Sequence, residues 1–226
     1  MDLIEARGLR FPARAAGPAD GRLVLLLHGF PQTSHEWRAQ LAALGGAGYR
    51  AVAFDQRGYA PTARPARVEA YRMDELVADT LAVADALGAG VFDVVGHDWG
   101  GVVAWHLGGR HADRLRTLTV VSTPHPMAHA RALRSGGEQA RMSSYFALFR
   151  QEGRAEDVLL ADDARRLRSL FGGSAAAGGP YVELMRDRAA LTGGLSWYRA
   201  SSYRDTEKVG RIRVPTLYVW GADDPV

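Results

Sequence analysis

The chain of 226 residues has no cysteine, a single lysine and no long apolar run. The absence of cysteine excludes disulfide bonds and a thiolate nucleophile. Lys208 is the only lysine, the arginines are scattered among acids, and the formal net charge is only +3, so no basic stripe for nucleic acid is present. No segment approaches the roughly 18 apolar residues of a membrane span, and residues 1–5 lack the features of a signal peptide. We therefore expect a cytoplasmic protein with no nucleic-acid or membrane partner.

Short apolar runs alternate with amphipathic segments along most of the chain. Hydrophobic residues make up 47% of the sequence, enough for a sizeable core. A hairpin is predicted within residues 2–17. Strands are predicted near 22–28, 50–55, 91–96, 115–122 and 215–220, with helices near 34–44, 73–87 and 99–110. This alternation predicts an α/β fold whose mostly parallel sheet is covered by helices on both faces.

The alternation breaks between Pro124 and about Asp205, where helix-like pieces are divided by glycine-rich stretches. We expect a helical lid over residues 125–205, inserted after the sixth strand, and an α/β core formed by residues 1–124 and 206–226. The glycine-rich residues 172–179 resemble a phosphate-binding loop only superficially, because no strand precedes them and no Lys-Ser/Thr follows. A flexible connection within the lid is predicted there.

Residues 96–100, with the sequence GHDWG, follow a predicted strand and precede a predicted helix. The glycines at both ends allow a sharp turn that presents Asp98 at its top, exposed and strained. A carboxylate at this position can act as a nucleophile, but it lacks the hydroxyl with which a serine esterase forms its acyl-enzyme. The alternative is that Asp98 only caps the helix behind it, since aspartate is a preferred N-cap residue.

Five segments together resemble the α/β-hydrolase fold family, and within it the epoxide hydrolase and haloalkane dehalogenase branch. They are residues 28–31 (HGFP), 55–59 (DQRGY), 96–100 (GHDWG), 122–124 (STP) and 220–224 (WGADD). The resemblance implies that Asp98 is the nucleophile and that the backbone N–H groups of Phe30 and Trp99 form the oxyanion hole. It also implies that Asp224 is the acid of the triad, with Asp223 as the alternative. The substrate-binding residues would be His28, Pro31, Trp99, Phe146, Phe149 and Trp197. Arg57 would either orient the loop near the site or form a surface ion pair.

Two tyrosines of the predicted lid distinguish an epoxide hydrolase from a haloalkane dehalogenase. Tyr145 and Tyr198 match the places where epoxide hydrolases carry the two tyrosines that assist ring opening, although aromatic residues of a lid also serve as packing residues. A haloalkane dehalogenase would use the same nucleophile on an alkyl halide. In part of that family an Asn that binds halide stands where this chain has Phe30, which has no hydrogen-bonding side chain. The resemblance thus favours an apolar epoxide as substrate, with no metal and no other cofactor.

The sequence departs from this family at its C-terminal end. All seven histidines precede Asp224, whereas the family's triad histidine follows the acid. We expect the chain to form an alkyl ester at Asp98 without hydrolysing it, with His125 as the nearest substitute base. On this view the chain is C-terminally truncated, lacks the last strand and helix of the fold, and exposes a sheet edge that favours pairing of two copies. A non-catalytic binding protein with a retained pocket is the alternative.

Overall fold

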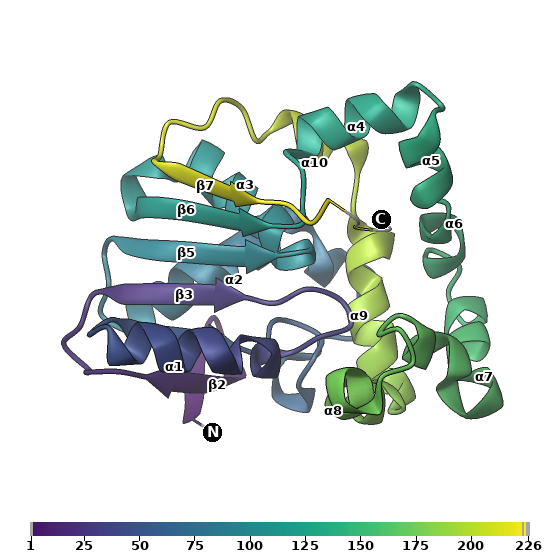
Figure 1. Cartoon of the computed structure of the whole chain (residues 1–226), viewed down its shortest axis with the longest axis horizontal. Coiled ribbons are helices and arrows are strands. Elements are labelled where there is room, and N and C mark those ends of the chain that lie inside the picture. The colour runs from purple at the N-terminus through teal and green to yellow at the C-terminus, as the bar shows by residue number, and fades with distance from the viewer. Residues whose placement is uncertain (1, 223, 225–226) are drawn as a thin grey trace.

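The computed structural model describes residues 2–222 and 224, and its centre is a seven-stranded sheet (Figure 1). The strand order is β1-β2-β4-β3-β5-β6-β7. The strands are β1 (Asp2–Ala6), β2 (Leu9–Ala16), β3 (Leu23–Leu27), β4 (Arg50–Phe54), β5 (Phe92–His97), β6 (Leu115–Val121) and β7 (Thr216–Val219). The pairs β1–β2 and β2–β4 are antiparallel and all others are parallel. The predicted hairpin and the five later strands are confirmed.

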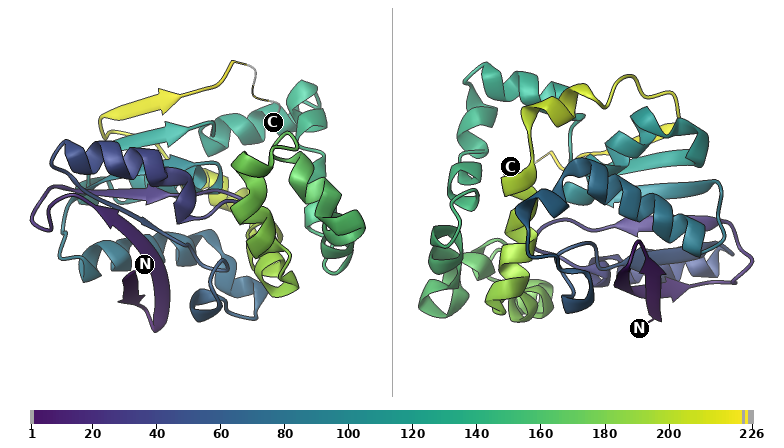
Figure 2. Two further views of the ribbon diagram at one scale, coloured as in Figure 1. Left: turned by 60° about the horizontal axis from the view of Figure 1, so that its bottom comes forward. Right: turned by 180° about the vertical axis from the view of Figure 1, so that it is seen from behind.

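Strand β3 shows why these segments form a buried sheet. All five of its residues are buried, because alternate side chains pack on opposite faces. Leu25 and Leu27 join the larger core with α2 (Met73–Ala86) and α3 (Trp99–Arg110). On the other face, Leu26 packs against Trp37, which precedes α1 (Arg38–Gly46), and against Leu41 within that helix. Helices therefore cover both faces, as predicted (Figure 2). Short 3-10 turns η1 (Ser34–Trp37), η2 (Pro61–Ala63), η3 (Val68–Tyr71) and η4 (Ala112–Arg114) complete the connections.

A helical insertion, residues 126–207, follows β6 and lies beyond the carboxyl ends of the parallel strands (Figure 1). It consists of α4 (Pro126–Arg134), α5 (Glu138–Met142), α6 (Tyr145–Phe149), α7 (Arg154–Ser169), α8 (Ala175–Met185), α9 (Arg188–Ala200) and α10 (Tyr203–Glu207). The backbone of α7 departs from helical angles at residues 161–164. The expected flexible connection at 172–179 is wrong from Ala175 onwards. The Ser174 hydroxyl accepts a hydrogen bond from the N–H of Ala177 and caps α8, and the alanines that follow favour a helix.

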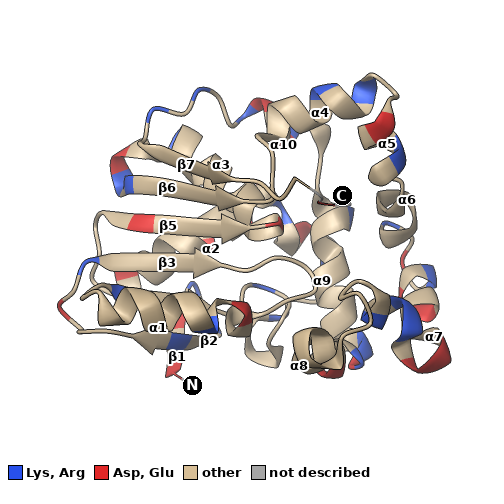
Figure 3. Ribbon diagram, in the orientation of Figure 1, with Lys and Arg blue, Asp and Glu red and all other residues tan. Residues whose placement is uncertain are grey.

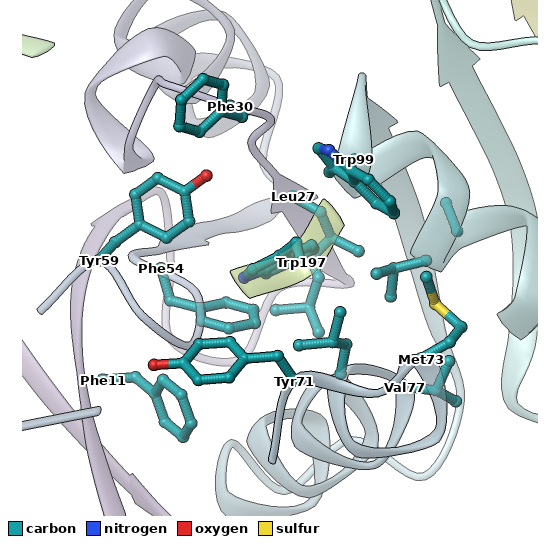
Figure 4. Packing of buried hydrophobic residues seen from close by; sticks show 14 of the residues in the cluster. Phe11, Leu27, Phe30, Phe54, Tyr59, Tyr71, Met73, Val77, Trp99 and Trp197 are labelled. Atoms are coloured by element: carbon teal, nitrogen blue, oxygen red, sulfur yellow. The ribbon is translucent and has the colours of Figure 1, made fainter. Parts of the chain in front are cut away.

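Helix α9 packs directly on the core. A Cβ at Gly193 would lie 2.3 Å from the carbonyl oxygen of Gly58, so the backbones meet where only glycine fits. Four residues further along α9, the indole N–H of Trp197 donates to the carbonyl of Arg57 at 2.9 Å. Figure 4 shows the Trp197 ring among buried side chains of the core. These contacts join α9 to the loop after β4.

Strand β7 is the exposed edge of the sheet, and it carries no charged residue (Figure 3). Two of its apolar side chains are open to solvent, with Leu217 59% exposed and Val219 44% exposed. No helix among the described residues is long and apolar enough to span a membrane. An uncharged apolar edge strand favours pairing with another strand.

Replacing Leu217 by Lys is therefore expected to weaken self-association of the chain. Burying a leucine contributes about 1.5–3 kcal/mol, so the dissociation constant should rise about tenfold or more. Analytical ultracentrifugation over a concentration series measures this shift. The control is Leu170→Lys, because Leu170 is a similarly exposed leucine at the end of α7. A monomeric parent chain at every concentration would contradict the prediction.

Candidate active site

Asp98 lies on a strained turn between β5 and α3. Its backbone angles, φ 51° and ψ −120°, are unfavourable for a residue other than glycine. A Cβ at Gly96 would lie 2.3 Å from the carbonyl oxygen of Gly100, so the turn closes only with glycine at that position. The Thr123 hydroxyl donates to the carbonyl oxygen of Asp98 at 2.9 Å and supports the turn. Asp98 occupies the N-cap position of α3, but its side chain forms no capping hydrogen bond there.

The Asp98 carboxylate points toward the loop after β3. Its Oδ1 accepts a hydrogen bond from the N–H of Phe30 at 2.7 Å, and the Trp99 N–H also hydrogen-bonds the carboxylate. Gly29 permits this approach, since a Cβ there would lie 2.4 Å from Oδ1. Burial raises the pKa of Asp98 and outweighs the opposing effects of His97 and of the two N–H groups. The side chain is half-buried rather than exposed, and two N–H groups converge on it.

Tyr145 from α6 and Tyr198 from α9 lie beside this carboxylate. Their ring centroids are 6.2 Å apart. The Trp99 ring packs edge-on against the Tyr198 ring, with centroids 5.0 Å apart. Burial raises the pKa of both phenols well above the usual range, and the negative charge of Asp98 raises both further. Both phenols are therefore protonated and able to donate at neutral pH.

A pocket of about 520 Å³ opens between α3 and the helical insertion. Four predicted site residues line it: Asp98, Trp99, Tyr145 and Phe146. Phe30, Phe149 and Tyr198 do not line it but form an adjoining aromatic cluster, with ring centroids 5.0–5.5 Å apart. The pocket therefore places the Asp98 carboxylate beside aromatic side chains of α3 and α6.

Three predicted substrate-binding residues lie in the surrounding structure rather than on the pocket wall. Trp197 is 1% exposed and packs behind Trp99, with ring centroids 5.9 Å apart. Pro31 is buried. His28 Nε2 accepts from the N–H of Gln56 at 2.9 Å, so its proton resides on Nδ1 and is directed to the Gly29 carbonyl at 3.0 Å. Burial lowers the pKa of His28 to about 4, so the ring is neutral and holds the loop after β3 in place.

The predicted acid, Asp224, lies near Asp98. The negative charge of Asp224 raises the pKa of both Asp98 and His97, which indicates that the carboxylate lies near the turn. Asp223, the alternative acid, lies outside the described residues.

The histidines near the site are engaged locally. Nδ1 of His97 lies 3.3 Å from a carboxylate oxygen of Glu36; burial lowers the pKa of His97, but the hydrogen bond and charge of Glu36 raise it above the usual value. His125 accepts from the N–H of Met127 and packs against Trp105, and it does not line the pocket. No described histidine forms a hydrogen bond to Asp98.

The sequence interpretation missed much of the pocket wall. Val102 and His106 follow Trp99 at helical spacing on α3, so they share its face and line the same pocket. That spacing was a usable signal. The sequence held no such signal for the wall contributed by α4, α5 and α10, because that wall depends on how the insertion folds back. Among residues 2–222 and 224, no group of three or more metal-ligating side chains occurs.

Arg57 holds the loop near the site through a buried ion pair. Its Nε and Nη2 donate to both oxygens of Asp79 at 2.6 Å, and both side chains are less than 10% exposed. The surface ion pair considered for Arg57 is therefore wrong.

A mostly parallel sheet, a strained acidic turn after β5 and two converging N–H groups define an α/β hydrolase. The alpha/beta hydrolase fold family matches residues 22–226, so the chain belongs to this family and is a hydrolase. It is similar to epoxide hydrolase A of Mycobacterium tuberculosis, with 34% identity over 99% of this chain and 82% of that protein. Mouse epoxide hydrolase 4 is 33% identical over 98% of this chain and 65% of its own length.

Solved structures agree with this assignment. The crystal structure of epoxide hydrolase A from Mycobacterium thermoresistibile superimposes with a TM-score of 0.84 at 30% identity, over 99% of this chain and 82% of that one. An epoxide hydrolase from Bacillus megaterium, in complex with an inhibitor, gives a TM-score of 0.87 at 28% identity over 99% and 84%.

Proposed function

We propose that this hydrolase opens an apolar epoxide through an ester at Asp98. The observation that carries the proposal is the placement of two protonated phenols, Tyr145 and Tyr198, beside the Asp98 carboxylate. A carboxylate nucleophile alone is compatible with several leaving groups, but two proton donors beside it favour a leaving group that departs as an alkoxide. The similarity to epoxide hydrolases supports the same conclusion.

In the first step, a carboxylate oxygen of Asp98 attacks an epoxide carbon in line with the breaking ring C–O bond. The bond electrons move to the ring oxygen, which takes a proton from a tyrosine hydroxyl, and the tyrosinate that remains is reprotonated from solvent. The product is a hydroxyalkyl ester on Asp98. The helical insertion, which we propose acts as the lid over residues 125–205, supplies both tyrosines and part of the pocket wall.

In the second step, water attacks the carboxyl carbon of Asp98. The N–H groups of Phe30 and Trp99, which already meet the carboxylate, would stabilise the tetrahedral oxyanion, and collapse of this intermediate releases the diol. A base must take a proton from the water, and Asp224 is proposed to assist it as the acid. Because no described histidine is hydrogen-bonded to Asp98, we expect the ester to persist in this chain.

The haloalkane dehalogenase alternative is less well supported. Such an enzyme directs N–H donors at the departing halide, and Trp99 is the candidate donor. Here the Trp99 ring packs edge-on against Tyr198, with ring centroids 5.0 Å apart, and Phe30 offers no side-chain donor. These contacts favour the epoxide.

The discriminating experiment compares an aryl-alkyl epoxide with the matching primary bromide. Intact-protein mass spectrometry measures the rate of adduct formation, and solution assays measure diol. The double variant Tyr145→Phe, Tyr198→Phe is expected to slow alkylation by the epoxide about 10²–10⁴-fold. Alkylation by the bromide should change little, because bromide departs without a proton.

The control is Tyr181→Phe, because Tyr181 lies in the insertion but does not line the pocket. No adduct and no diol from a folded chain would exclude the epoxide function. Equal slowing with both reagents would mean that the tyrosines only shape the pocket.

A further inference from the structure

Three polar side chains lie together on the pocket wall formed by α4, α5 and the turn that follows α5: His129, Gln139 and Ser143, here termed the α4–α5 polar cluster. They share the pocket with the aromatic residues Trp99, Tyr145 and Phe146. We infer that this cluster binds a neutral hydrogen-bonding substituent of the substrate, a carboxamide or a hydroxyl, carried at a distance from the epoxide. The inference rests on the proposed function for the epoxide and adds a second recognition site to the same pocket.

The cluster is a connected hydrogen-bond network. The Gln139 side-chain amide donates to Oγ of Ser143 at 3.1 Å, and Nε2 of His129 lies 3.4 Å from the same oxygen. Ser143 is 8% exposed, so its hydroxyl is held within the wall. The Phe146 ring lies 6.3 Å from the His129 ring and joins the cluster to the aromatic part of the pocket.

The network fixes which groups remain available to a ligand. In the arrangement that we assign, the Ser143 hydroxyl accepts from Gln139 and donates to Nε2 of His129, so that the ring proton of His129 resides on Nδ1. Burial lowers the pKa of His129, so the ring is neutral. The cluster therefore presents one donor, Nδ1–H of His129, and one acceptor, Oε1 of Gln139. Neither atom has a hydrogen-bond partner among residues 2–222 and 224.

A carboxamide or hydroxyl matches this pair, since each can accept from His129 and donate to Gln139. The pocket is lined by two arginines, Arg134 and Arg150, and by two aspartates, Asp98 and Asp205, so its charged side chains do not favour a substituent of either charge. A carboxylate could not donate to the Gln139 oxygen. The two arginines are also held elsewhere: Arg134 lies over the Tyr203 ring at 4.6 Å, and Arg150 donates to the Tyr198 carbonyl at 3.1 Å.

The test uses unreactive probes, so that it does not depend on chemistry at Asp98. Three aryl diols that differ only in their para substituent, carboxamide, isopropyl or carboxylate, are titrated calorimetrically into the whole chain. The carboxamide is expected to bind about tenfold more tightly than the isopropyl compound, as one to two net hydrogen bonds allow. Gln139→Leu and Ser143→Ala should each remove most of that preference.

The matched control is Gln151→Leu, because Gln151 is an exposed glutamine beyond α6 that does not line the pocket. It should leave the preference unchanged. Equal affinity for the carboxamide and isopropyl diols, no binding of either, or a preference that survives both cluster variants would overturn the inference. Tightest binding of the carboxylate would overturn it in favour of the arginines. If carboxamide selectivity is found but Asp98 is not alkylated by any epoxide, the proposed function fails and the binding site stands.

Discussion

Replacing Asp98 by Asn is expected to lower the rate of alkylation by epoxides about 10⁴-fold or more, since a neutral amide is a poor nucleophile. The fold should be retained, because the carbonyl oxygen of the introduced amide can still accept the N–H of Phe30 that Oδ1 of Asp98 accepts at 2.7 Å. The loss would therefore report chemistry rather than unfolding. Intact-protein mass spectrometry with peptide mapping gives both the rate and the position of the adduct.

A second aspartate on β5 provides the control. Asp93 forms a short ion pair with Arg22 and does not line the pocket. The Asp93→Asn chain, once its folding has been checked, should therefore be alkylated by epoxides at the parent rate. Parent-rate alkylation of the Asp98→Asn chain at another residue would show that the carboxylate on the strained turn is not the nucleophile.

Replacing Asp79 by Asn is expected to lower the free energy of unfolding by about 3–5 kcal/mol. Asp79 is 2% exposed, it receives two hydrogen bonds from buried Arg57, and Arg7 donates to it at 2.8 Å. The substitution leaves the Arg57 guanidinium buried without its counter-charge. Urea-induced unfolding, followed by circular dichroism, measures the change in stability.

Glu75→Gln is the matched control, because Glu75 pairs with the same Arg7 at the surface. Both side chains of that pair are about one third exposed, so solvent screens the interaction and its loss should cost less than about 1 kcal/mol. Equal losses for the two variants would contradict a special role of the buried pair.

The α/β core was predictable because its signals are local. Each buried parallel strand, such as β3, is a short apolar run, and a strand that is buried on both faces needs no other pattern. The turn around Asp98 was predictable for a similar reason, because Gly96 and Gly100 are required by contacts within a few residues of the turn and with the adjacent β3. Prediction failed at residues 175–179, where glycine content outweighed the cap supplied by Ser174.

Only part of the pocket could be predicted, because the rest of its wall depends on long-range packing. Trp99 and Asp98 could be placed from one motif, whereas Gln139 and His129 meet only because α4 and α5 fold against each other. Trp197 shows the opposite error. Trp197, which precedes Tyr198 in the sequence, was expected to bind the substrate. Its indole N–H instead donates to the carbonyl of Arg57, a core residue 140 positions earlier in the chain. Whether it also influences the substrate stays a prediction.

The glycine contact between α9 and the core limits how far this helix can move. With Gly193 against Gly58 and Trp197 hydrogen-bonded to Arg57, α9 cannot swing outward without breaking a close backbone contact and exposing a buried indole. The two tyrosines therefore differ mechanically: Tyr198 is anchored to the core by the backbone of its own helix, whereas Tyr145 on α6 is held through ring contacts with Phe149 and Tyr198.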